Sequence, residues 1–146
     1  MRPRHRRTDA PAHSWALARR MVPVLAAAVV GASCGDGTGP TSGTAIVAMI
    51  GATPARSAQF RLVGAQSGLA ASSADFRIFT SPIGQDTVMI AVVANTGHLL
   101  SEGNLVTVTV PDLGKVPQYS LTLLQVASPT YSLQNIGAYT LTITAQ

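Results

Sequence analysis

Short runs of apolar and β-branched residues, separated by turn signals, occupy the chain from residue 44 onward. Gly, Pro or Asn falls between successive runs roughly every 8–15 residues, as in domains built from antiparallel strands. No stretch of this region has a sustained 3.6-residue apolar period, so little helix is expected. We therefore predict an all-β domain over residues 44–146, a single antiparallel β-sandwich of about seven to nine strands. The runs are Thr44–Ile50, Ala58–Val63, Asp75–Thr80, Thr87–Val93, Leu105–Val110, Tyr119–Val126 and Tyr139–Thr144.

Alternation between apolar and polar residues is clearest in two of these runs. The valines of Leu105–Val110 fall on one face and its threonines on the other, and Tyr139–Thr144 has three threonines opposite Tyr, Leu and Ile. Each run therefore predicts a strand with one core face and one wet face. Thr87–Val93 is apolar on both faces, which predicts a central strand. The last run has no charge and no Pro, so it should be firmly paired, because such an edge would otherwise aggregate.

The first forty residues have a different character. Residues 1–20 contain six arginines and one acid, Asp9, and residues 21–32 are apolar throughout. Twelve helical residues would span about 18 Å, short of the roughly 30 Å bilayer core. A basic region, a short apolar region and small residues are typical of a secretory signal peptide, predicted here over residues 1–33. A transmembrane helix is the alternative, which Pro23 and Gly31 disfavour.

The only cysteine follows this apolar region directly. Gly31-Ala-Ser-Cys34 resembles the lipobox of bacterial lipoproteins. The resemblance implies that Cys34 is lipidated on its thiol and becomes the first residue of the mature chain. The sequence departs from the motif because Gly31 stands where Leu or Val is usual, with Val30 one place further out. Arg19-Arg20 leaves twin-arginine export open beside the general route.

Other roles for Cys34 have less support. A disulfide needs a second cysteine, and a zinc site needs several Cys or His ligands near one another. A catalytic thiol usually lies in a structured pocket, whereas the residues after Cys34, up to Gly43, are a flexible Gly-, Ser-, Thr- and Pro-rich linker. A free thiol after ordinary signal cleavage remains the alternative. The lipobox resemblance implies several acyl chains on Cys34, which would anchor the protein stably to a bacterial membrane, facing the periplasm or the cell surface.

Charge argues against nucleic acid as a partner. The chain carries ten Lys and Arg and six Asp and Glu, a formal net charge of +4. Six arginines and one aspartate precede Cys34, so four basic and five acidic residues remain after it, a net charge of −1. A nucleic-acid binder needs a clustered basic face. The remaining charges are Arg56, Arg61, Arg77 and Lys115 with Asp36, Asp75, Asp86, Glu102 and Asp112.

A stretch in the second half of the chain resembles a known family. Residues 95–110, NTGHLLSEGNLVTVTV, resemble the late strands of cohesin-type sandwiches, in which a polar turn and Gly-x-Leu precede an alternating strand. The layout is also similar to that of short bacterial lipoproteins of unassigned role. The resemblance implies a cohesin-like or immunoglobulin-like sandwich over Thr44–Gln146. Cohesins bind dockerin modules and related sandwiches bind carbohydrate, but no binding motif can be matched residue by residue.

Catalytic chemistry has few candidate residues. His98 is the only histidine after Cys34, in a predicted turn, and no Gly-x-Ser-x-Gly elbow accompanies it. Four acids at strand ends or turns could pair for glycoside hydrolysis, but acids are common turn residues. We expect no enzyme activity, no cofactor and no metal site. The four acids are Asp75, Asp86, Glu102 and Asp112.

Aromatic residues are the remaining candidates for ligand binding. The sole tryptophan, Trp15, would be removed with the signal peptide. Tyr119 and Tyr131, near strand ends, are the candidates for exposed rings on which a sugar could stack. Phe79 should point away from Phe76, three residues earlier. The expected core aromatics are Phe60, Phe76 and Tyr139.

The predicted function is therefore a non-catalytic interaction or structural module, anchored to a membrane in the cell envelope and meeting a protein or glycan there. A carbohydrate-binding module is the alternative, and a hydrolase that uses His98 or paired acids ranks third.

Lipid attachment at Cys34 can be tested by labelling cells with a clickable fatty acid. We expect the full-length chain to take up the label and the Cys34→Ser variant to lose it. Label that persists in the variant would contradict attachment at this thiol.

Overall fold

A computed structural model describes residues 39–100 and 103–146. The predicted signal peptide, Cys34 and the first part of the linker lie outside the described residues. No helix within these two ranges is long and apolar enough to cross a membrane.

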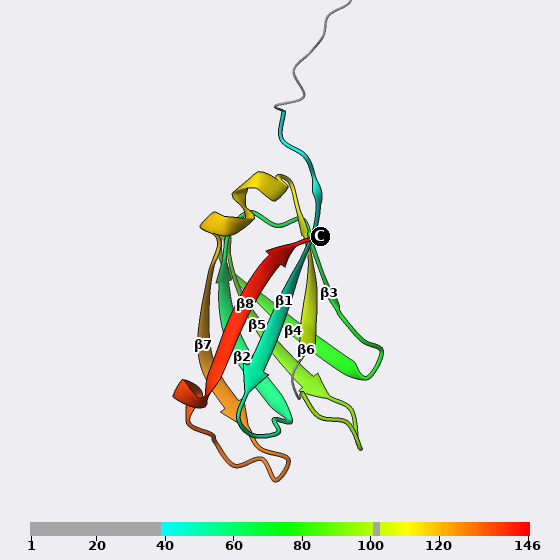
Figure 1. Cartoon of the computed structure of the whole chain (residues 1–146), viewed down its shortest axis with the longest axis vertical. Helices are drawn as coiled ribbons and strands as arrows, with labels where there is room; N and C mark the ends of the chain where they lie inside the picture. Colours follow the sequence, from blue (N-terminus) through cyan, green and yellow to red (C-terminus); the bar gives the residue numbers. More distant parts are fainter. Residues whose placement is uncertain (1–38, 101–102) are drawn as a thin grey trace, which may run out of the picture. The chain divides into compact units, whose positions relative to one another are not determined.

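Eight strands form two antiparallel sheets that face each other (Figure 1). Sheet A has the strand order β3-β6-β1-β8, and sheet B has the order β4-β5-β2-β7. This arrangement confirms the predicted all-β sandwich. The strands are β1 (Gly43–Gly51), β2 (Ser57–Val63), β3 (Gly68–Ala71), β4 (Phe76–Gly84), β5 (Thr87–Ala94), β6 (Gly103–Val110), β7 (Ser120–Ala127) and β8 (Tyr139–Ala145), and two short 3₁₀ helices are η1 (Leu113–Gln118) and η2 (Ile136–Ala138).

Alternate residues of the inner strands build the core between the sheets. In β5, every second residue from Val88 to Ala94 is buried, and the residues between them are half-buried. In β2, Phe60 and Leu62 are fully buried and Arg61 between them is exposed. The period-two pattern thus separates a core face from an outer face, as predicted. β5 lies between β4 and β2, which confirms that it is central.

Two features of the strands differ from the sequence prediction. β3 was missed because its sequence, Gly-Leu-Ala-Ala, has no β-branched residue, and only its pairing with β6 makes it a strand. β4 runs on to Gly84, through Ser81-Pro-Ile-Gly84, where the sequence predicted a turn. Proline is tolerated there because β4 is an edge strand, and the register shifts between Pro82 and Gly84.

A register shift also explains why Leu105 is buried. Val47 pairs with Val106, but the next residue of β1, Ala48, pairs with Asn104. Leu105 is therefore an extra residue in β6, a β-bulge, and both Leu105 and Val106 are buried.

The last strand is paired on one side only. β8 pairs with β1 along its whole length, from Ala45↔Ala145 to Gly51↔Tyr139. Nevertheless it lies at the edge of sheet A, with no second neighbour among the described strands. The firm pairing that the sequence predicted is therefore present on the β1 side, but β8 is an edge strand.

Two phenylalanines of sheet B test this separation of core and surface. Phe60→Ala should lower the free energy of unfolding by about 3–5 kcal/mol, because it leaves a cavity in the core. Phe79→Ala should change it by about 0.5 kcal/mol or less, because the ring is 60% exposed. Urea unfolding of both purified variants measures the difference. Equal losses would contradict the strand faces described above.

Candidate functional site

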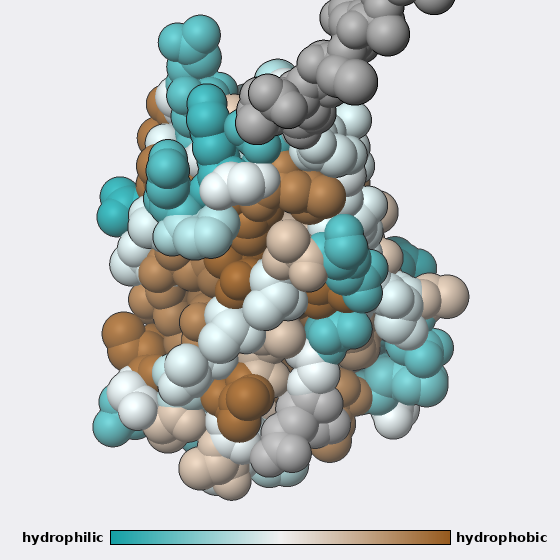
Figure 2. Space-filling view, turned by 45° about the horizontal axis from the view of Figure 1, so that its top comes forward, coloured by the Kyte–Doolittle hydropathy of each residue, from teal (hydrophilic) through white to brown (hydrophobic). Residues whose placement is uncertain are grey.

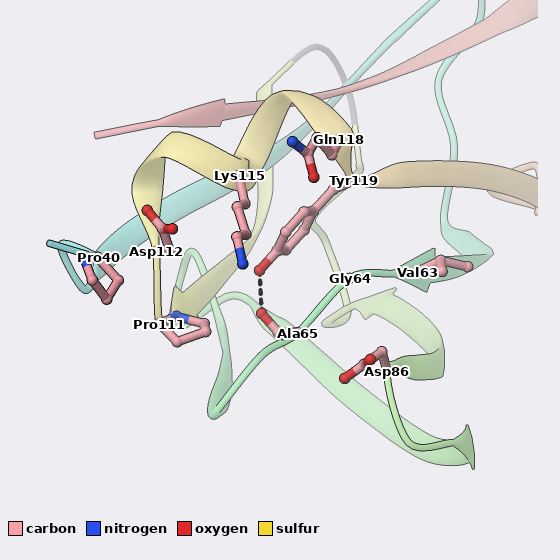
Figure 3. A pocket seen from close by; sticks show the side chains of 10 residues that line it. All are labelled: Pro40, Val63, Gly64, Ala65, Asp86, Pro111, Asp112, Lys115, Gln118 and Tyr119. Carbon is pink, nitrogen blue, oxygen red and sulfur yellow. Dashed lines mark hydrogen bonds between the residues drawn. The ribbon is translucent and has the colours of Figure 1, made fainter. Parts of the chain in front are cut away.

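A cavity of about 460 Å³ opens beside Tyr119, at the end of the sandwich where η1 lies (Figure 3). Its walls come from four segments: the linker before β1, the loop after β2, the turn between β4 and β5, and η1 with its flanking residues. We call it the Tyr119 pocket. Its lining residues are Pro40, Val63, Gly64, Ala65, Asp86, Pro111, Asp112, Lys115, Gln118 and Tyr119.

Tyr119 is held in place from both ends of its side chain. Its backbone N–H ends η1 by donating to the carbonyl of Val116, at 3.0 Å. Its hydroxyl donates to the carbonyl of Ala65 (Figure 3). The ring lies flat on Gly64, where an added Cβ would come within 2.5 Å of it. Gly64 also has a φ of +149°, so only glycine allows this approach of loop and ring. The ring is half-buried, less exposed than the sequence suggested.

The polar groups of the pocket carry both charge signs. Asp112 caps η1 by accepting a hydrogen bond on Oδ1 from the Gly114 N–H, at 3.0 Å. Asp86, Lys115 and Gln118 add a second carboxylate, an ammonium group and an amide. Burial raises the pKa of Tyr119, and the nearby charges of Asp86 and Asp112 raise it further. The phenol therefore stays protonated at neutral pH and keeps its hydrogen bond to Ala65.

This combination suits binding of an uncharged ligand rich in hydroxyl groups. Carboxylate oxygens accept hydrogen bonds, whereas the ammonium and amide groups donate them. The Tyr119 ring and the prolines Pro40 and Pro111 provide apolar wall. Two carboxylates against one ammonium group disfavour an anion. Within residues 39–100 and 103–146, no three His, Cys, Asp or Glu side chains lie close enough to hold a metal ion.

Tyr131, the other predicted tyrosine, lies at the opposite end of the sandwich. β7 separates the two, since Tyr119 precedes its first residue and Tyr131 follows its last (Figure 1). Tyr131 is 67% exposed, as expected, and Arg56 lies over its ring with the guanidinium carbon 5.8 Å from the centroid. Its φ of +62° is uncommon for a bulky residue and belongs to a tight turn. The two tyrosines therefore cannot form one platform.

His98 and Asp75 come together, but not as a catalytic triad. His98 Nδ1 lies 3.5 Å from Asp75 Oδ2, with both side chains about half exposed. Ser73 Oγ donates to the same carboxylate oxygen at 3.3 Å. The carboxylate is thus in the middle, whereas a triad needs the imidazole between serine and carboxylate. Of the other acids, Asp86 and Asp112 share the Tyr119 pocket, and Glu102 lies outside the described residues.

A second surface was missed by the sequence analysis: the outer face of sheet B, which we call the sheet-B face. Phe79, on β4, points outward, opposite in sense to Phe76 as predicted, and its ring is 60% exposed. In the register of the sheet, Ser81 pairs with Met89, and Met89 pairs with Arg61, so these side chains form a row beside Phe79. Arg77 lies at the other side of Phe79 on the same strand.

The sheet-B face has no negative charge. β2, β4, β5 and β7 contain Arg61 and Arg77 but no Asp or Glu. Above β2, β5 and β7 the face has a shallow hollow of about 160 Å³, bordered by Leu133, which is 74% exposed. The period-two alternation predicted that Phe79 points outward, but not which side chains of other strands surround it.

Comparisons of this chain with protein-family models, with curated proteins and with solved structures found no match.

The raised pKa of Tyr119 predicts a loss of stability in alkali. An unfolded tyrosine ionises at about pH 10 and the folded Tyr119 only at higher pH, so the folded state holds the proton longer. The contribution of Tyr119 is fully present below about pH 10 and is lost as the pH rises through its folded pKa. Tyr119→Phe should be less stable than the unchanged protein at pH 8, but its stability should fall less between pH 8 and pH 11. Thermal melts measure this, with Tyr131→Phe as the control. Parallel curves for Tyr119→Phe and the unchanged protein would contradict the burial of the phenol.

Proposed function

We propose that this chain is an exported, lipid-anchored, non-catalytic module that binds a protein partner in the cell envelope through the sheet-B face. The lipobox-like sequence at Cys34 supports the anchor. The described domain supports the binding role, because it offers an extended outer face with a distinctive set of side chains.

The composition of the sheet-B face is the observation that carries the proposal. Protein interfaces are enriched in aromatic residues, Met and Arg, and their centres are depleted of acids. Phe79, Met89, Arg61 and Arg77 lie on neighbouring strands of one sheet, without an acidic side chain among them. The strands behind them are fixed by the core, so the face is pre-organised and loses little entropy on binding.

The positive charge of the sheet-B face indicates what kind of partner surface it would bind. Arg61 and Arg77 are both exposed, and an uncharged partner surface would offer neither guanidinium group an ion pair. A partner with an apolar centre and acidic side chains at its rim would contact Phe79 and pair with both guanidinium groups. We therefore expect binding to weaken as the ionic strength rises.

The linker would keep this domain close to the membrane. Nine residue steps separate Cys34 from Gly43, the first residue of β1. An extended chain of that length spans about 30 Å at most. With Cys34 as the anchor, the domain would reach partners in or near the same membrane, which fits an envelope module.

A glycan in the Tyr119 pocket is the second candidate. The half-buried ring of Tyr119 lies beside Asp86, Lys115 and Gln118, which together can accept and donate hydrogen bonds to sugar hydroxyls. The resemblance to cohesin-type sandwiches is compatible with either ligand, since that fold class includes binders of protein and of carbohydrate.

A binding experiment separates the two candidates. The mature chain carrying Cys34→Ser is incubated with an envelope fraction, before and after protease digestion of that fraction. We expect digestion to abolish binding, and Phe79→Ala to weaken it by about tenfold or more, as at an interface hot spot. Tyr131→Ala, at an exposed ring outside the sheet-B face, is the matched control and should bind normally.

Binding that survives digestion and is lost in Tyr119→Ala would favour the glycan. No binding to either fraction, or normal binding by Phe79→Ala, would contradict a protein partner on the sheet-B face.

A further inference from the structure

The free edge of β8 differs from the other three sheet edges of the described domain. β3 has only four residues, and β4 carries Arg77 and Pro82, both of which discourage pairing with another strand. β7 is partly covered, because Ala127 bridges to Leu133 and the Gln134 N–H donates to the Val126 carbonyl, at 2.8 Å. β8 has no charge, no proline and no bulge, and although β7 and η1 lie close to it, no described residue forms a bridge or backbone hydrogen bond along its outer edge.

The register with β1 shows which backbone groups of β8 face outward. Gln146 N–H donates to the Thr44 carbonyl at 2.8 Å, and Ala52 N–H donates to the Ala138 carbonyl at 3.2 Å. Both bonds join even-numbered residues, one at each end of the pairing between β1 and β8. In an antiparallel pair every second residue bonds to the partner strand, so the even-numbered residues of β8 bond to β1. The backbone groups of Leu141, Ile143 and Ala145 therefore point away from β1, and no described strand is hydrogen-bonded to them.

The sequence of β8 is nearly symmetric in chemical type about Thr142. Leu141 and Ile143 flank it, with Thr140 and Thr144 on either side of them. The outermost pair is Tyr139 and Ala145, a large and a small residue. Two-fold interfaces bring one surface against itself, so they require this kind of self-complementarity.

We propose that two copies of this chain associate through antiparallel pairing of their β8 strands, across a two-fold axis at Thr142. Leu141 then lies opposite Ile143 of the second copy. The backbone N–H of each residue donates a hydrogen bond to the backbone carbonyl of the other. Thr142 faces its own counterpart, and Thr140 faces Thr144. Sheet A becomes one continuous eight-stranded sheet in the dimer.

The surroundings of β8 favour a second copy over a charged partner. The threonines of β8 and the outward residues of β1, Thr44, Ile46, Ala48 and Ile50, are all uncharged, so two copies meet without repulsion. Leu141 and Ile143 of β8 and Leu121 and Leu123 of β7 are only partly buried and lie at this open side. Figure 2, which looks at the front of Figure 1 from above, shows a broad hydrophobic area on this side of the domain.

Single cysteines test both the association and its register. Cys34→Ser in the full-length chain leaves an introduced cysteine as the only thiol. In Thr142→Cys the two Cα atoms would be about 4.5 Å apart, in a non-hydrogen-bonded pair, within reach of a disulfide. In Thr140→Cys, the two copies of residue 140 would be about 13 Å apart along the strands, too far for a disulfide.

After mild oxidation we expect Thr142→Cys to form covalent dimers and Thr140→Cys to remain monomeric. A mixture of Thr140→Cys and Thr144→Cys proteins should cross-link with each other. Monomers in every case, or equal cross-linking of all three variants, would overturn the proposed register.

A charge at the axis tests the association without any disulfide. Thr142→Lys places two ammonium groups opposite each other, and the exposed side chain leaves the core intact. Sedimentation of the Cys34→Ser chain should show a dimer, Thr142→Lys should shift it to the monomer, and Thr109→Lys, on the outer face of β6, should not. A Cys34→Ser chain that sediments as a monomer at its solubility limit would overturn the proposal, as would a dimer that Thr142→Lys leaves intact.

Discussion

Contact between the inner faces of the two sheets is the interaction on which the rest of the structure depends. Among the described residues the domain has no covalent cross-link, so burial of side chains such as Phe60, Leu62 and Ile90 must offset the entropy lost on folding. Because strand residues alternate, fixing these inward residues also fixes the outward ones. The sheet-B face and the outer threonines of β8 therefore follow from the packing of the core.

Much of this fold is predictable from local sequence, and the exceptions have physical reasons. Apolar runs separated by turn signals located seven strands, and the run that is apolar on both faces indicated the central position of β5. β3 was not predictable, since its residues have low strand propensity and only β6 makes them a strand. The extension of β4 past Pro82 depends on its place at a sheet edge, and edge positions follow from strand order, which involves residues far apart in the chain.

The candidate sites were less predictable than the fold. Tyr119 was found as an aromatic residue near a strand end, but its neighbours in the pocket come from segments as distant as Pro40 and Asp86. Phe79 was correctly predicted to point away from Phe76, yet its row of neighbours depends on the register of three strands. The symmetry of β8 about Thr142 is visible in the sequence, but it has a meaning only once the strand is known to be an edge.

Amide hydrogen exchange of the full-length protein tests the central claim most directly, if it is compared between the envelope fraction of expressing cells and a detergent extract. Binding through the sheet-B face predicts that β4, which carries Phe79 and Arg77, exchanges more slowly in the envelope, because a partner packed on these side chains opposes local opening of this edge strand. Unchanged exchange in β4, with new protection confined to the loop at Gly64 and Ala65 beside Tyr119, would contradict a protein partner on this face.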